Sequence, residues 1–263
     1  MRRPRLFSVW AERPINVLEQ SPVAPLPQPR IFFDIITYSG GIAMHGMVYR
    51  IRNGSAAAAL ALAFTTSLGS AQSPAHFHIG HAAEAFRGTP DGMGLLPTAI
   101  AEAEIAHQHA TLAGRDPSSL EGMQRHMAHV IHAMDASRVE SGPGMGYGVV
   151  AASERAAQHT ELAAASEGAS DAVKTHSVHV ATAARSAAAH AEQAIELAEG
   201  IQAAESATDA AEMLAELTGL TDAILNGVDS DGNGRVGWQD GEGGLAQAAT
   251  HMSLIKQAEG LGN

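Results

Sequence analysis

The chain has 263 residues, a formal net charge of −12 and no cysteine. An acidic protein repels nucleic acid and anionic lipid, and without cysteine there are no disulfides, thiolate metal sites, covalently attached c-type haem or cysteine-linked lipid anchor. The acidity lies beyond residue 71, where 25 of the 28 acidic residues but only nine of the 16 basic ones are found. We therefore expect cations, and not nucleic acids, as binding partners.

Residues 47–71 have the pattern of a secretory signal peptide. Arg50 and Arg52 precede the apolar run 56–64, which is short for a membrane span, and small residues then lead to a cleavage point before Gln72. A single membrane anchor is the alternative interpretation of this segment. Cleavage predicts a mature protein that is periplasmic or secreted.

Residues 1–46 are rich in proline and arginine and fit no fold pattern. Met44 and Met47 each offer a later start. We interpret residues 1–46 as a non-native upstream extension.

Helix signals dominate the remaining chain, and no useful alternation of apolar and polar residues indicates a strand. Asp116 and Pro117 predict a helix start, and the Gly/Pro-rich run 141–148 predicts a loop. Helices are predicted over 97–114, 116–135, 149–166, 170–204, 207–227 and 243–258. We expect an all-α fold, with a His-rich helical bundle over 72–205 and a helix-loop-helix over 206–263.

An internal repeat relates two helical hairpins. A shift of fifty residues aligns 101–135 with 151–185 without a gap, and eleven of the 35 positions are identical. The shared pattern is Gln-His-x2-Leu-Ala followed by His-x2-His-Val-x2-Ala, so three histidines coincide. Two such hairpins side by side predict an up-down bundle.

Each hairpin is expected to bring its three histidines together. His109 lies about eight residues before the first turn and His126 about eight after it, so antiparallel helices place both at one height. His129 follows one helical turn later. The expected triplets are His109, His126 and His129 in the first hairpin, and His159, His176 and His179 in the second.

Repeated imidazoles indicate transition-metal ligation. Neutral imidazole is a good ligand for Cu(II), Zn(II) and Ni(II), and two histidines at i,i+3 can share one ion. His78 and His81 have the same spacing, and His190 continues the stripe of His179, which makes these three residues further candidates. The alternative is that the histidines are polar residues on solvated faces. His107 and His132 fit that alternative best, because the second copy has Ala157 and Thr182 at these positions.

The signal peptide, the absence of cysteine and the repeated His-bearing helical hairpins together resemble the periplasmic small metal-binding proteins. The resemblance covers about residues 95–205. It implies a four-helix bundle that takes up copper and other divalent ions, with ligand roles for the six repeated histidines. It does not extend to the region of His78 and His81 or to the C-terminal part.

Non-covalent b-type haem is the alternative cofactor. Helical bundles hold haem between histidines of different helices, and Met123, Met127 and Met134 are candidates for a sixth ligand. The small residues around the repeated histidines leave room for a porphyrin, but almost no aromatic residue is available to line its pocket. Periplasmic electron transfer would be the function that follows from haem.

Residues 229–240 resemble an EF-hand calcium loop. Oxygen-bearing side chains alternate at the first, third and fifth positions, and Gly234 falls where the loop must turn sharply. The resemblance implies Ca²⁺ ligation by Asp229, Asp231, Asn233, the carbonyl of Arg235, and Asp240. Asp240 replaces the usual glutamate, and Glu242 is a nearby additional donor. Because the motif occurs once, we expect a structural clip between the last two helices.

These patterns predict a binding protein and not an enzyme. The sequence contains no nucleophile elbow, no Gly-rich phosphate loop, no H-E-x2-H motif and no Cys–His pair. We expect an exported protein that sequesters or buffers Cu, Zn or Ni and has a separate structural Ca²⁺ site. The alternatives are a haem protein and an accessory subunit whose only site is the calcium loop.

Overall fold

The structure is a computed structural model that describes residues 73–262. The predicted signal peptide over 47–71 and the predicted extension over 1–46 lie outside the described residues. Within 73–262 the chain forms α-helices, one 3₁₀ turn and isolated bridges, but no strand, so the all-α prediction is confirmed.

The helices are α1 (Pro74–Ala83), α2 (Leu95–Ala113), α3 (Leu120–Met134), α4 (Val149–Ala165), α5 (Asp171–Ala203), α6 (Ala207–Asn226) and α7 (Leu245–Glu259). The 3₁₀ turn η1 (Pro90–Gly92) lies between α1 and α2. Most ends fall within two residues of their predicted positions, whereas α1 was not predicted.

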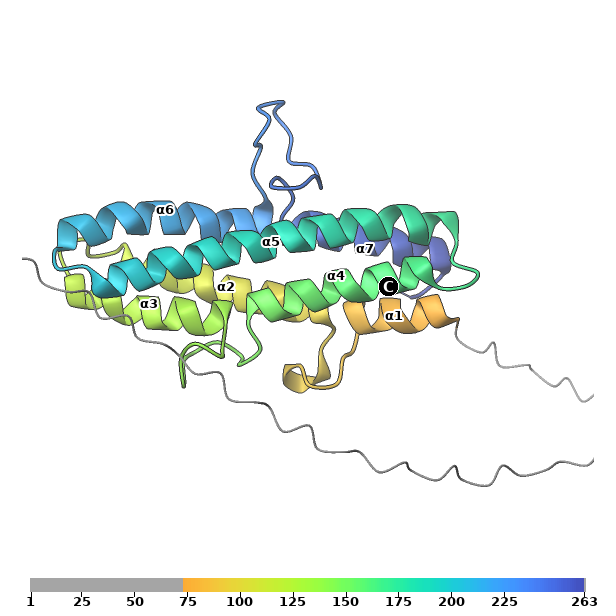
Figure 1. The fold of residues 1–263 in the computed structure, drawn as a ribbon, viewed down its shortest axis with the longest axis horizontal. Helices are drawn as coiled ribbons and strands as arrows, with labels where there is room; N and C mark the ends of the chain where they lie inside the picture. The colour runs from red at the N-terminus through yellow and green to blue at the C-terminus, as the bar shows by residue number, and fades with distance from the viewer. Residues whose placement is uncertain (1–72, 263) are drawn as a thin grey trace, which may run out of the picture. The chain divides into compact units, whose positions relative to one another are not determined.

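The bundle is organised around α5, which runs along its full length (Figure 1). Helices α3 and α4 lie end to end beside α5, as do α6 and α7, and α5 contacts all four. Helix α2 packs against α3, α4 and α6, while α1 packs against α4. All the described helices belong to one compact unit. None of them is both long and apolar enough to cross a membrane.

Helix α3 begins later than the sequence indicates. The Asp116 carboxylate accepts hydrogen bonds from the backbone N–H and the hydroxyl of Ser118, so it closes a turn and does not cap a helix. The hydroxyl of Ser119 instead accepts the N–H of Gly122, at 3.1 Å, and caps α3. The predicted start at 116–117 is therefore wrong by about one turn.

Alanine supplies half of the buried residues of the main core, and valine, leucine, isoleucine and methionine supply the other half. Between α4 and α5, a separate buried contact consists of Ala157, Ala181 and Ala184 alone. Helix axes usually lie 8–10 Å apart, and small side chains at the contact favour the short end of that range.

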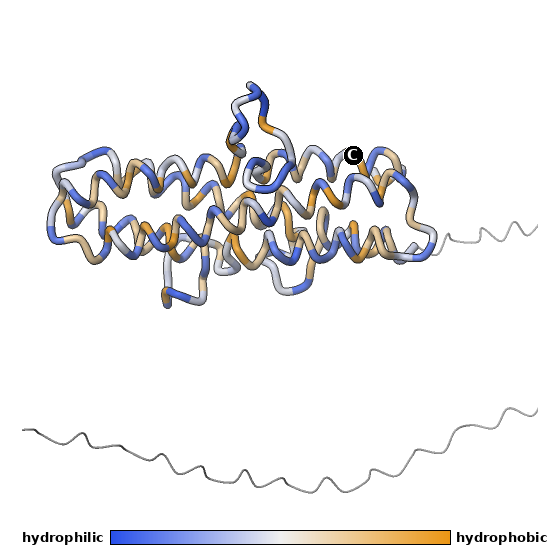
Figure 2. Tube along the Cα trace, turned by 45° about the horizontal axis from the view of Figure 1, so that its top comes forward, coloured by the Kyte–Doolittle hydropathy of each residue, from blue (hydrophilic) through white to orange (hydrophobic). Residues whose placement is uncertain are grey.

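Two loops separate the helices that lie end to end beside α5. The loop between α3 and α4 is held by Glu102, whose fully buried carboxylate accepts the N–H groups of Met145, Tyr147 and Gly148 at 2.9, 2.9 and 3.0 Å. The loop 227–244, between α6 and α7, projects from the bundle and is largely hydrophilic (Figure 2).

Candidate metal centres

Nine of the 14 histidines gather in three groups of three. We call them the α1–α4 triad (His78, His81 and His159), the α2–α3 triad (His109, His126 and His129) and the α5–α7 triad (His176, His179 and His251). Each takes two histidines at i,i+3 from one helix and a single histidine from a neighbouring helix. In every triad the ligand nitrogens lie within 4.8 Å of one another, and all nine side chains are half-buried.

In the α2–α3 triad the Nδ1 atoms converge. Nδ1 of His109 lies 3.0 Å from Nδ1 of His126 and 3.2 Å from Nδ1 of His129. A deprotonated ring nitrogen has one lone pair, so Nδ1 of His109 cannot accept a well-aligned hydrogen bond from both neighbours. When the protons are on the Nε2 atoms, the three Nδ1 lone pairs converge. Three convergent lone pairs are the arrangement that a cation binds.

The α5–α7 triad has the same form. Nδ1 of His251 lies 3.1 Å from Nδ1 of His176 and 3.4 Å from Nδ1 of His179. The His179 ring also stacks on the indole of Trp238, with 3.9 Å between ring centroids and 21° between their planes. This triad is therefore in direct contact with the loop between α6 and α7.

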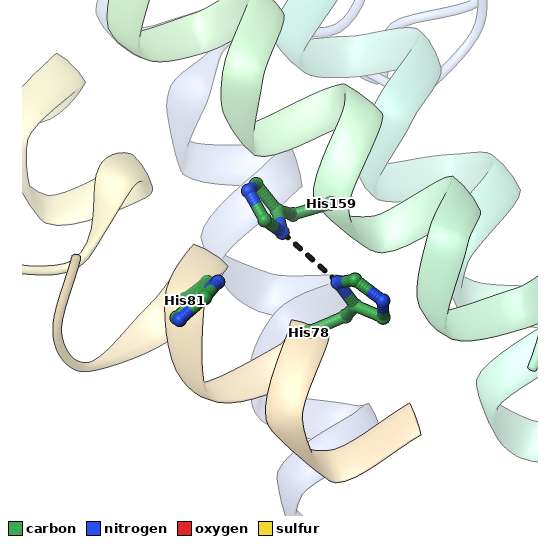
Figure 3. Close-up of side chains that lie close together, drawn as sticks. All are labelled: His78, His81 and His159. Atoms are coloured by element: carbon green, nitrogen blue, oxygen red, sulfur yellow. Dashed lines mark hydrogen bonds between the residues drawn. The ribbon is translucent and has the colours of Figure 1, made fainter. Parts of the chain in front are cut away.

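In the α1–α4 triad the rings surround a common space between the two helices (Figure 3). Nδ1 of His78 lies 3.1 Å from Nδ1 of His159, and the buried Nδ1 of His81 has no hydrogen-bond partner. The ring of His81 also lies against Phe77 and Phe86, with centroids 4.1 and 5.2 Å away. Aromatic neighbours limit water access on one side of this triad.

Burial favours the neutral form, which metal ligation requires, in six of these imidazoles. Removal from water disfavours the charged ring, and each neighbouring histidine adds repulsion. For this reason the pKa is lowered below the ordinary histidine value in His78, His109, His126, His159, His179 and His251. The lone pairs are accordingly available at neutral pH.

The predicted first triplet comes together, but the predicted second triplet does not. His159 joins His78 and His81 on α1, while His176 and His179 join His251 on α7. Side chains two positions apart in a helix, such as those of residues 157 and 159, point about 200° apart around its axis. Because Ala157 faces α5, His159 points away from α5. In the first copy His107 faces α6 through Thr221, at 3.0 Å, which leaves His109 free to face α3.

His251 is the site residue that the sequence reasoning missed. It lies outside the fifty-residue repeat, and its only sequence signal is its place in the middle of the helix predicted over 243–258. His190 was a further candidate, but in the described residues it joins no group of potential ligands, and its buried Nδ1 has no hydrogen-bond partner.

A fourth group of potential ligands lies in the projecting loop and consists of Asp229, Asp231 and Glu242. The Asp229 carboxylate accepts the N–H groups of Asn233 and Gly234 at 3.0 and 2.8 Å, which curls the chain around it. Asn233 Oδ1 accepts the N–H of Arg235 at 2.9 Å. These contacts hold the first half of the loop in a tight turn.

Asp240, the expected last ligand, is exposed and lies outside this group. The N–H groups of Glu242 and Gly243 both donate to the carbonyl of Gln239, at 3.0 Å each, so the chain turns with Asp240 on its outer side. Glu242 faces inward instead. Its side chain is only 3% exposed, and its Oε1 has no hydrogen-bond partner.

Comparisons with protein-family models, with curated proteins and with solved structures find no match to this chain.

Proposed function

We propose that the protein binds transition-metal ions at its three histidine triads and thereby sequesters or buffers them. The observation that carries the proposal is the spacing of the ligand nitrogens. A tetrahedral ion at 2.0–2.1 Å from its imidazole ligands requires nitrogens about 3.3 Å apart. In the α2–α3 and α5–α7 triads the single histidine of one helix has its Nδ1 3.0–3.4 Å from the Nδ1 atoms of both histidines of the other helix.

The ligand set narrows the choice of ion. Three imidazoles without thiolates suit Cu(II), Zn(II) and Ni(II), and Cu(II) binds most tightly of these in most sites. Haem is less suited, because its two axial ligands lie on opposite sides of a porphyrin and do not converge on one point. Three protein ligands leave one coordination position open. An open position at a half-buried site lets an ion exchange, which suits buffering better than permanent storage.

Export to the periplasm or beyond belongs to the proposal. The signal-peptide pattern over 47–71 favours it. N-terminal sequencing of protein recovered outside the cytoplasm should give a start at Gln72. Recovery of the chain only in the cytoplasm would remove this part of the proposal.

We further propose a structural Ca²⁺ site in the loop 227–244. Hard carboxylate oxygens are the ligands that Ca²⁺ prefers, and Asp229, Asp231 and Glu242 supply three of them. A buried carboxylate without a partner, such as that of Glu242, is costly unless a cation neutralises it. The resemblance of 229–240 to an EF-hand loop supports the same ion, with Glu242 in the role expected of Asp240.

The metal content of variants tests the main proposal. Metal-free protein is loaded with Zn²⁺ while saturating Ca²⁺ occupies the loop, passed through gel filtration and analysed by native mass spectrometry. We expect three Zn²⁺ ions, one for each triad. Each of His159→Ala, His109→Ala and His251→Ala should lose one ion.

The matched control is His107→Ala, which removes a half-buried histidine that bonds to Thr221 and belongs to no triad. It should retain all three ions. Unchanged metal content in the triad variants would overturn the proposal, as would an equal loss in the control.

A further inference from the structure

The loop 227–244 and the α5–α7 triad share one structural element. The indole of Trp238 stacks on His179 of the triad, and Glu242, four residues later, belongs to the acidic group of the loop. The segment 238–242 therefore touches a transition-metal site at one end and a candidate Ca²⁺ site at the other.

This segment is docked firmly on α5. The N–H of Gly241 donates to the hydroxyl of Ser186 at 2.9 Å. A Cβ at Gly243 would lie 2.8 Å from the Cβ of Ala183, so the loop backbone approaches α5 as closely as a glycine allows. Ala183 and Ser186 follow His179 by four and seven residues, so the residues that the loop contacts lie on the same face of α5 as the triad.

Glu242 links the contact of segment 238–242 with α5 to the acidic group of the loop. Its carbonyl accepts the N–H of Val228 at 2.9 Å, and its N–H donates to Gln239. With no cation, the three clustered carboxylates repel one another, and the buried Oε1 of Glu242 has no partner. The position of 238–242 seen in the structure is thus the position that a bound cation favours.

We propose that Ca²⁺ in the loop and a transition-metal ion in the α5–α7 triad bind with positive cooperativity, because both ions need segment 238–242 in this docked position. The inference rests on the proposed function. Ca²⁺ held by Glu242 keeps Trp238 stacked on His179. The His179 ring is then already fixed before the transition-metal ion binds, so that binding costs less conformational entropy. Three carboxylates exceed the charge of one Ca²⁺, so the filled loop does not repel the second cation.

The expected size of the effect follows from the cost of immobilising one side chain. Fixing the ring of His179 in advance should tighten the triad about three- to tenfold. Coupling between binding equilibria is reciprocal, so an ion in the triad should tighten Ca²⁺ binding by the same factor.

Trp238 reports on its own triad, because paramagnetic Cu²⁺ quenches a nearby indole. The chain has two tryptophans, and Trp10→Phe leaves Trp238 as the only tryptophan, which selective excitation of indole then reports. His109→Ala and His159→Ala in the same background disable the other two triads. Metal-free protein is titrated with glycine-buffered Cu²⁺, with and without saturating Ca²⁺.

We expect Cu²⁺ to quench Trp238 and Ca²⁺ to lower the midpoint about three- to tenfold. Glu242→Gln should abolish this shift while leaving the quenching itself. Asp240→Asn is the matched control, because it removes a carboxylate of the same loop outside the acidic group, and it should retain the shift. Circular dichroism verifies that both variants are folded.

A second readout does not depend on fluorescence. Diamagnetic Zn²⁺ should raise Ca²⁺ affinity by the same factor in calorimetry, and His251→Ala should remove that effect. Quenching with identical midpoints in the presence and absence of Ca²⁺ would overturn the cooperativity and leave the proposed function intact. No quenching, together with no Cu²⁺ bound to this background, would instead count against the triad as a metal site.

Discussion

His109 and His126 face each other across the α2–α3 hairpin with their Nδ1 atoms 3.0 Å apart. Only one proton fits between the two facing Nδ1 atoms, and His129 adds a third nitrogen 3.2 Å from His109. Protons and metal ions therefore compete for the same lone pairs. The pH response of the metal-free protein is the simplest consequence of this geometry.

We expect the metal-free protein to lose stability as the pH falls below about 6.5. Burial lowers the pKa of His109 and His126 in the folded state, so the unfolded chain binds more protons between the lowered value and about 6.5. The free energy of unfolding then rises with pH through that window and is constant above it.

Urea unfolding on both sides of that pH measures the effect. A His109→Ala/His126→Ala variant should show a shallower dependence, because two of the contributing groups are gone. An identical slope in the variant and the parent would show that these rings do not cause it.

Metal binding should stabilise the folded protein by joining pairs of helices. At a free Zn²⁺ concentration of a hundred times Kd, one site adds about 2.7 kcal/mol, which corresponds to roughly 5–10 °C in Tm for a bundle of this size. Removing one triad with His251→Ala should reduce the total gain in Tm by that amount. His190→Ala removes a histidine outside the triads and should retain the full gain.

Glu242 and Asp240 should differ sharply in their effect on Ca²⁺ affinity. Glu242→Gln removes a buried carboxylate of the acidic group and should weaken Ca²⁺ binding by about tenfold or more. Asp240→Asn changes an exposed residue outside the group and should have little effect. Calorimetric titration of both variants measures this, and a larger loss in Asp240→Asn would restore the ligand set expected from the sequence.

Glu102→Ala should destabilise the bundle by about 2–4 kcal/mol. The substitution leaves the N–H groups of Met145, Tyr147 and Gly148 without their acceptor and opens a space in the core. Glu104→Ala on the exposed face of α2 is the control and should stay within about 0.5 kcal/mol of the parent. Urea unfolding compares them, and equal values would mean that the loop is held by other contacts.

The sequence predicted what local spacing determines. Helix positions followed from periodicity and from breakers such as the run 141–148, and the α2–α3 triad followed from the distances of its histidines to the turn. The partner of His176 could not be predicted in this way, because it depends on which neighbouring helix its face meets. That choice is determined by Ala181 and Ala184, which direct the opposite face of α5 toward α4.

The acidic loop shows the same limit. Asp229 and Asp231 were identified from the alternation of oxygen ligands, whereas the last donor depends on where the chain turns back toward the bundle. The shared acceptor at Gln239 delays α7 to Leu245 and turns Glu242 inward. The spacing of the EF-hand motif corresponds to a following helix that starts before Leu245.

The alanine contact between α4 and α5 has a consequence for how the protein could be tuned. Ala157 packs against Ala181 and Ala184, and a contact of such small side chains lets the axes of α4 and α5 approach closely. Those two helices carry His159 toward α1 and His176 toward α7. A larger side chain at this one buried position would separate the two helices and so change the positions of histidines in two candidate ion sites at the same time.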